Sequence, residues 1–180
     1  MRAALALFLA GLATSACAES RPAPVTVASV VRQACFTGSM EREAFQTMAQ
    51  ADGWEPLRFN PPPGVSDWGT GFAKGNVKIM LTGSDAAASE TRGGRQITKP
   101  AHRTCSVLIT GPGAEWREEI ESLAAEGGFA PSSAEGEGRE WSKGGKELLR
   151  STYSPATDIL NITVYRIADA SIRLLNTTNE

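Results

Sequence analysis

The 180-residue chain is mildly acidic, with 18 Lys and Arg side chains against 20 Asp and Glu and a formal net charge of −2 at pH 7. A nucleic-acid partner is not expected, because there is no surplus of positive charge to displace counterions from a phosphate backbone. Without its first residues the chain still has the length of one domain with its own core.

Residues 1–18 have the pattern of a signal peptide. Arg2 precedes an apolar run, Ala3–Ala13, that is too short to anchor in a bilayer. The small residues Ala16 and Ala18 predict cleavage near Ala18 and a periplasmic or secreted protein. The alternative is a lipoprotein anchored through Cys17, and a diacylglyceryl group found there by mass spectrometry would decide for it. No later segment is long and apolar enough to cross a membrane.

Residues 19–34 are predicted to be an N-terminal tether, although the Val-rich part could be a short strand or the entry to a helix. The first clear helix spans Ser39–Ala51, with Ser39 as N-cap and Gly53 after its end. Its apolar stripe is expected to face the core. The stripe consists of Met40, Ala44, Phe45, Met48 and Ala49.

The chain then changes to a strand pattern. A possible strand at Leu57–Asn60 precedes a hairpin whose strands, 68–73 and 77–82, are joined by the turn Lys74-Gly75-Asn76. The following segment, 83–103, is polar, basic and glycine-containing, and loops this long are usually functional or disordered. It is therefore the candidate interaction loop, unless it is an insertion without a role. Its basic side chains and histidine are Arg92, Arg95, Lys99, His102 and Arg103.

A buried strand at 104–110 follows this loop and carries Cys105. If Cys17 leaves with the signal peptide, Cys35 and Cys105 form an even pair, which predicts a disulfide in an oxidising compartment. The alternative is that both are buried thiols. The second helix is expected at 114–126, with Trp116, Ile120, Leu123 and Ala124 on one face. A flexible acidic loop is expected at 132–138. The C-terminal tail at 169–180 is polar at its end and could hold a short helix or an extra strand before that. The remaining predicted strands are 140–143, 146–153 and 159–167.

The two halves of the chain share an order of residues. A helix stripe, a glycine, an aromatic and a proline recur at one constant spacing, and a Trp and a Lys-Gly turn follow in each half. The matched positions are Phe45, Met48, Ala49, Gly53, Trp54 and Pro56 with Ile120, Leu123, Ala124, Gly128, Phe129 and Pro131, then Trp68 with Trp141 and Lys74-Gly75 with Lys143-Gly144. Trp54 and Phe129 are expected to plug the core at equivalent corners.

The resulting fold expectation is α+β. Two tandem α-β-β-β repeats, 35–110 and 111–168, pack as a single domain at 35–168, with a mostly antiparallel sheet and two helices. The shared order of residues also places the long basic loop in the first repeat only, since the short segment 154–158 takes its place in the second. That difference makes the loop the preferred position for a function.

The chain carries no recognisable catalytic set. His102 is the lone histidine and is expected to be solvated, the two cysteines are assigned to a disulfide, and no G-x-S-x-G elbow occurs. No metal or cofactor site is expected. The leading hypothesis is a non-enzymatic exported module that binds a protein or an envelope component, with its oligomeric state open. The alternatives are a small envelope hydrolase or transferase whose site forms only in three dimensions, and a lipid-anchored envelope protein.

Overall fold

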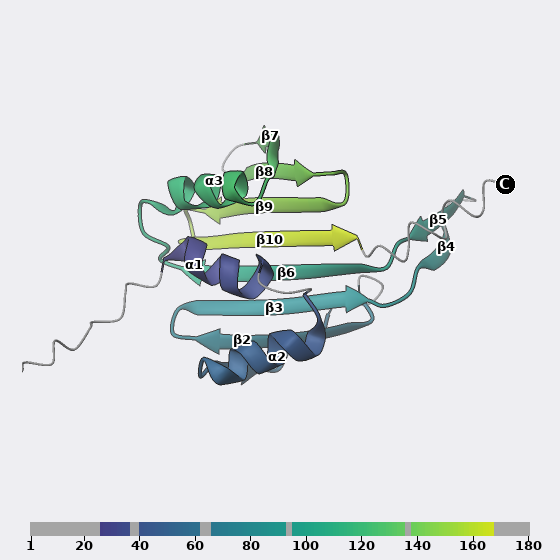
Figure 1. Ribbon diagram of the computed structural model, residues 1–180, viewed down its shortest axis with the longest axis horizontal. Helices are drawn as coiled ribbons and strands as arrows, with labels where there is room; N and C mark the ends of the chain where they lie inside the picture. Colours follow the sequence, from purple (N-terminus) through teal and green to yellow (C-terminus); the bar gives the residue numbers. More distant parts are fainter. Residues whose placement is uncertain (1–25, 37–39, 62–65, 93–94, 136–137, 168–180) are drawn as a thin grey trace, which may run out of the picture.

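A computed structural model describes residues 26–36, 40–61, 66–92, 95–135 and 138–167. The predicted signal peptide at 1–18, the lipidation candidate Cys17, the predicted helix cap Ser39 and the predicted tail at 169–180 lie outside these residues. The described residues form a mixed α and β domain built on one large antiparallel sheet (Figure 1).

Within the described residues, eight strands form the sheet, in the order β1-β2-β3-β6-β10-β9-β8-β7. Each neighbouring pair is antiparallel. The strands are Glu55–Leu57 (β1), Trp68–Lys74 (β2), Val77–Ser84 (β3), His102–Thr110 (β6), Ala130–Glu135 (β7), Gly138–Lys143 (β8), Glu147–Ser154 (β9) and Ile159–Ile167 (β10). The second sheet is a hairpin of β4 (Ala88–Arg92) and β5 (Arg95–Lys99).

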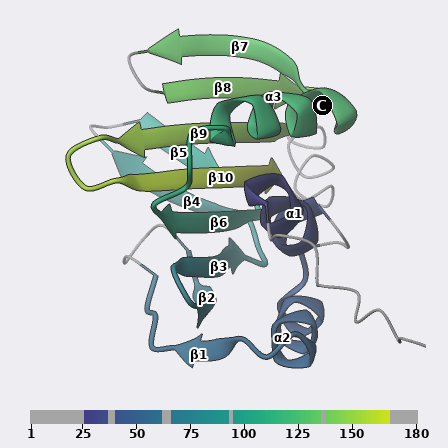
Figure 2. The ribbon, with the colours of Figure 1, turned by 90° about the vertical axis from the view of Figure 1, so that its left-hand side faces the viewer.

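Helices cover one face of the large sheet (Figure 1). They are α1 (Val27–Val31), which continues as the π-helical turn η1 (Arg32–Phe36), α2 (Arg42–Ala51) and α3 (Trp116–Glu126). Figure 2 shows α1 between α2 and α3, beside the middle of the sheet. No helix among the described residues is long and apolar enough to cross a membrane.

The core lies between the sheet and the helices because the central strands alternate. In β6, Cys105, Val107 and Ile109 are buried, and the residues between them lie on the opposite face and are partly exposed. The register places Val107 between Ile79 of β3 and Ile162 of β10, both fully buried. The strand predicted at 104–110 is therefore a central strand of the sheet.

The helices pack on this layer through residues three and four apart. In α3, Trp116, Ile120, Leu123 and Ala124 are buried, as predicted. In α2, Phe45 and Ala49 are buried and Met48 is partly buried, whereas Ala44 is exposed, so that part of the predicted stripe is wrong. α2 also begins at Arg42, later than expected.

The segment 27–36 is not a tether. Val27, Val30 and Val31 of α1 and Ala34 and Cys35 of η1 are buried. Thr26 caps α1, because its hydroxyl accepts a hydrogen bond from the backbone amide of Ser29 at 3.1 Å. The domain therefore includes a third helix, which the sequence did not clearly predict.

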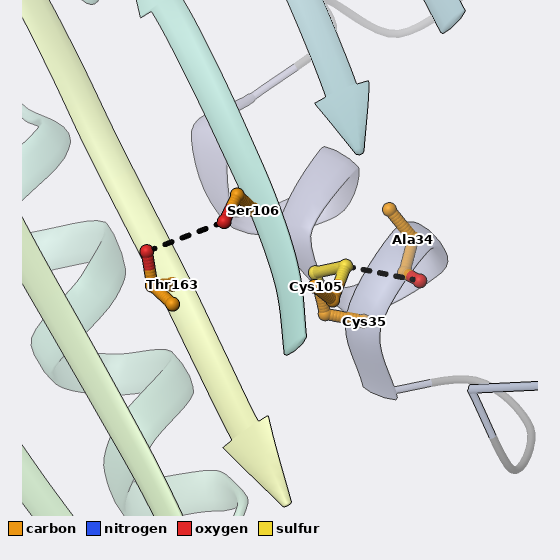
Figure 3. Close-up of a disulfide and its surroundings, with 5 residues drawn as sticks. All are labelled: Ala34, Cys35, Cys105, Ser106 and Thr163. Carbon is orange, nitrogen blue, oxygen red and sulfur yellow. Dashed lines mark hydrogen bonds between the residues drawn. A yellow bond between two sulfur atoms is a disulfide. The ribbon is translucent and has the colours of Figure 1, made fainter. Parts of the chain in front are cut away.

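The predicted disulfide between Cys35 and Cys105 is confirmed. Both residues are fully buried, and their Cα atoms lie 5.6 Å apart. Figure 3 shows the bond on the helix side of β6, while the next residue, Ser106, points toward Thr163 of β10. The disulfide thus joins η1 to the centre of the sheet.

Three predicted segments differ from the structure. The interaction loop at 83–103 contains the β4–β5 hairpin, and its ends belong to β3 and β6. Most of the loop predicted at 132–138 is strand β7, and the strand predicted at Leu57–Asn60 is instead Glu55–Leu57. The hairpin of β2 and β3 and the strands β8, β9 and β10 are confirmed, with small shifts at their ends.

Candidate functional site

The β4–β5 hairpin extends beyond the end of the main sheet (Figure 1). β3 leads into it at Ser84, and β6 leads out of it at His102. Its register pairs Ala88 with Lys99 and Arg92 with Arg95. The five predicted interaction residues are therefore divided: three lie on the hairpin and two, His102 and Arg103, lie on the first two positions of β6.

Arg103 anchors the root of the hairpin. Its Nη2 lies 2.8 Å from Asp85 Oδ1 and 3.5 Å from Glu41 Oε2. Its Nη1 donates to the backbone carbonyls of Ser84 and His102, both at 3.1 Å. Only 13% of the Arg103 side chain is exposed, so this arginine holds β3, β6 and α2 together and is not available to a partner.

An indole ring completes this root. Trp68 donates from Nε1 to Asp85 Oδ1 at 3.1 Å, and the Arg103 guanidinium lies 5.1 Å from the ring centroid. Gly83 makes the approach possible, because a Cβ atom there would lie 2.7 Å from Trp68 Cζ2 and 2.9 Å from the His102 carbonyl oxygen. Asp85 itself is exposed, so its ion pair with Arg103 contributes little to stability by itself.

His102 is buried, not solvated as the sequence suggested, with 8% exposed. Its Nδ1 lies 3.1 Å from the Pro100 carbonyl oxygen, and its ring stacks on Tyr165 at 5.5 Å between centroids. Burial raises the pKa of the Tyr165 hydroxyl above its usual value. Neither contact brings a carboxylate to the imidazole, which a hydrolase built on His102 would need.

Metal-ligand side chains do not gather in the described part of the chain. No group of three or more His, Cys, Asp or Glu residues there could hold a metal ion. The sulfur atoms of Cys35 and Cys105 are bonded to each other and are not ligands.

Sequence reasoning missed a cavity on the helix side, at the corner where α2 passes into β1. The cavity has a volume of about 330 Å³. It is lined by Val30, Gln33, Asp52, Trp54, Lys74, Asn76 and Val77. A second cavity of about 330 Å³ shares Val30, Asn76 and Val77 with it, so the two adjoin. These residues come from α1, η1, the end of α2 and the β2–β3 turn, and no local sequence pattern brings them together.

A third cavity, of about 540 Å³, lies beside α3 and β8. Its apolar base consists of Phe129 and Trp141, and Glu121 and Arg139 are among its other lining residues. In the first half, the side chain of Gln46 in α2 donates to the Thr70 hydroxyl of β2 at 3.5 Å.

No protein-family model, curated protein or solved structure matches the chain. A functional assignment therefore depends on the geometry of the molecule itself.

Proposed function

We propose that this protein is an exported, non-enzymatic interaction module that contacts an acidic protein or envelope component through the β4–β5 hairpin. The observation that carries the proposal is the hairpin itself, a separate two-stranded sheet that extends beyond the domain (Figure 1). The corresponding connection between β9 and β10 is only the short segment 155–158. A compact domain does not need the longer connection for its core.

The charge pattern of the hairpin favours an acidic partner. The hairpin carries three basic residues, Arg92, Arg95 and Lys99, and one acidic residue, Glu90, so its formal charge is +2. A positively charged segment favours a neighbouring anionic group. A partner with a cluster of carboxylates or phosphates would supply that group and would make the interaction sensitive to salt.

Internal duplication supports the view that the hairpin is an addition. We infer that α2-β1-β2-β3-β6 and α3-β7-β8-β9-β10 are two copies of one α-β-β-β-β unit. The strand order reads the same from both edges of the sheet under this pairing, and β6 and β10 meet in the middle. Each copy thus has four strands in the main sheet, one more than the sequence suggested.

Equivalent contacts support the duplication. Lys74 Nζ donates to the Asp52 carbonyl at 2.7 Å, and Lys143 Nζ donates to the Gly127 carbonyl at 2.9 Å. Both helices are followed by a glycine of positive φ, 70° at Gly53 and 74° at Gly128.

The register corrects one matched pair. Phe72 lies opposite Ile79 in β2–β3, and Trp141 lies opposite Leu149 in β8–β9. Phe72 and Trp141 are both buried, whereas Trp68 is only partly buried. Trp141 therefore corresponds to Phe72, and Trp68 belongs to the root of the hairpin instead. The hairpin and its indole anchor are features of one copy.

The Cys35–Cys105 disulfide supports export, because buried disulfides persist in oxidising compartments. The finding is compatible with both a soluble periplasmic or secreted form and a form anchored through Cys17.

The test removes two positive charges from the hairpin. A cell expressing the Arg92→Ser/Arg95→Ser double variant is treated with a crosslinker, and the species recovered with the protein are compared with those of the wild type. We expect the double variant to recover about tenfold less of the partner than the wild type does. Raised salt is expected to cause the same loss for the wild type.

The matched control is Arg117→Ser/Arg150→Ser, which removes the same charge from α3 and β9 and leaves the hairpin intact. Full recovery of every crosslinked species by the hairpin variant would contradict the proposal. Equal loss in both variants would contradict it too, because net charge and not the hairpin would then govern binding.

A further inference from the structure

The two copies differ at the corner between helix and first strand. In the second copy Phe129 is 6% exposed, because Phe36 of η1 packs edge-on against it at 5.7 Å and Lys143 lies 5.7 Å from its centroid. In the first copy Trp54 occupies the corresponding corner and is only partly buried. Its backbone amide donates to the Ala49 carbonyl at 2.9 Å, as that of Phe129 donates to the Ala124 carbonyl. Trp54 is therefore not a complete core plug, contrary to the sequence expectation.

One helical segment, α1 with η1, has contacts at both corners. α1 and η1 pack against α3, where the backbone amide of Ala28 donates to Glu119 Oε2 at 2.9 Å and Arg32 pairs with Glu126 at 2.5 Å. On the α2 side, Gln33 of η1 contacts Asp52 by a side-chain hydrogen bond. Gln33, Asp52 and Trp54 all line the cavity of about 330 Å³. This volume lies at the lower end of the range of small-ligand sites.

The chemistry of the cavity combines an aromatic platform with a polar rim. Trp54, Val30 and Val77 supply the apolar surface. The polar residues that line the cavity, called its rim below, are Gln33, Asp52, Lys74 and Asn76. Lys74 and Asn76 are held in place by backbone acceptors, because Lys74 donates to the Asp52 carbonyl at 2.7 Å and Asn76 donates to the Thr110 carbonyl at 2.6 Å.

The rim carries one carboxylate and one ammonium group, so its formal charge is balanced. Asp52 disfavours an anionic ligand and Lys74 disfavours a cationic one, since like charges disfavour binding at short range. A ligand that suits this rim is uncharged and carries groups that both donate and accept hydrogen bonds. Hydroxyl groups do both, so they can donate to Asp52 and accept from Lys74 and Asn76.

We propose that this cavity binds a ring of an uncharged oligosaccharide, with its C–H face stacked on Trp54 and its hydroxyl groups bonded to the rim. A pyranose ring has an apolar face and a polar circumference, and the indole ring offers the matching surface of an apolar body beside a wet edge. The site is separate from the hairpin, so it goes beyond the proposed function and can be tested independently of it.

The adjoining cavity provides room for a second sugar ring of the oligosaccharide. It continues from Val30 and Val77 to Ile109, and Glu115 and Glu119 line its far part. These carboxylates disfavour an acidic sugar, which agrees with the charge balance at Trp54. A second ring therefore lies between α1 and the β6–α3 connection, and a trisaccharide is expected to bind more tightly than its monosaccharide.

The experiment uses the mature protein with two uncharged probes, chitotriose and maltotriose, and one acidic probe, trigalacturonic acid. Binding is followed by isothermal titration, and ligand-observed NMR saturation transfer identifies the sugar protons that contact the protein. We expect saturable binding of at least one uncharged probe and binding of the acidic probe that is at least about tenfold weaker. Trp54→Ala is expected to weaken binding of the uncharged probe by at least about tenfold.

A matched pair of lysine variants separates ligand contact from folding. Lys74→Ala and Lys143→Ala each remove a hydrogen bond to an equivalent carbonyl, but only Lys74 lines the cavity. We expect Lys74→Ala to weaken binding by about threefold to tenfold and Lys143→Ala to leave it within about twofold of the wild type. Absence of binding by both uncharged probes, equal affinity for the acidic probe, or equal effects of the two lysine variants would each overturn the proposal. None of these outcomes bears on the hairpin, whose own variants change neither cavity.

Discussion

Removal of the Cys35–Cys105 disulfide is expected to cost the domain about 4 kcal/mol. The bond closes a loop across a sequence separation of 70 residues, and restriction of the unfolded chain over that length is worth about this much at 25 °C. Both cysteines are fully buried, and Cys105 pairs with Leu81 and Val164 in the middle of the sheet. The Cys35→Ala/Cys105→Ala variant also leaves small voids there, which adds to the loss.

The measurement is urea and thermal unfolding of three forms: the oxidised wild type, the wild type reduced under denaturing conditions and refolded with reductant, and the double alanine variant. A loss of about 4 kcal/mol corresponds to a fall in Tm of about 8–16 °C for a domain of this size. Thiol labelling of the denatured, unreduced wild type should find neither cysteine free. If all three forms unfold within about 1 kcal/mol of one another, restriction of the unfolded chain is not what the bond contributes.

Two further predictions concern Gly83, at the root of the hairpin, and Tyr165 of β10. Gly83→Ala is expected to destabilise the protein by about 1–3 kcal/mol, because the new methyl group would lie 2.7 Å from Trp68 Cζ2 and 2.9 Å from a backbone oxygen. Thermal unfolding measures the loss, and Thr82→Ala, on the opposite face of β3, is the control. An equal, small shift of Tm in both variants would show that the root can accommodate the methyl group. Tyr165 has a raised pKa in the folded protein because of burial, so its contribution to stability is complete below the pKa of the unfolded chain, near 10, and is lost as the pH rises through the folded value. Unfolding free energies measured between about pH 8 and 11 should fall less steeply for Tyr165→Phe than for the wild type, and parallel curves would contradict the assignment.

The strands of the centre could be predicted from the sequence because period-two burial leaves a clear pattern. β3, β6 and β10 each alternate buried and partly exposed residues, and β-branched residues are frequent in them. α3 was predictable for the corresponding reason, since its apolar residues recur at helical spacing.

Segments whose structure depends on their neighbours could not be predicted in this way. α1 has the sequence VASVV, whose valines favour strands, and a helix of five residues is not stable alone. Burial of its valines, contact with α3 and the disulfide in the following turn hold it in place. β7, with the sequence APSSAE, has few strand-forming residues and forms by pairing with β8.

The candidate sites could likewise be predicted only in part. The basic residues of the 83–103 segment were visible in the sequence, but its division into a hairpin and an anchored root was not. Arg103 has the same charge as Arg92, yet tertiary contacts make it part of the root. The cavity at Trp54 is lined by residues of α1, η1, the end of α2 and the β2–β3 hairpin, which are far apart in the sequence. The one sequence signal for it was the difference between Trp54 and Phe129 at matched positions, which the common expectation of a core plug obscured.

The pairing of β6 with β10 determines how a half-length chain would behave. Ser106 lies opposite Thr163, with their hydroxyl oxygens 3.4 Å apart, and the two strands pair over all nine residues of β6 (Figure 3). A chain that ended after β6 would leave that entire edge unpaired, and a second copy could pair with it in the same antiparallel manner around Ser106. In this protein the 111–115 connection joins the chain that contains β6 to the chain segment that contains its partner strand β10. Because one half is covalently held beside the other, the assembly of the sheet depends on effective concentration within the chain and not on the amount of protein in solution.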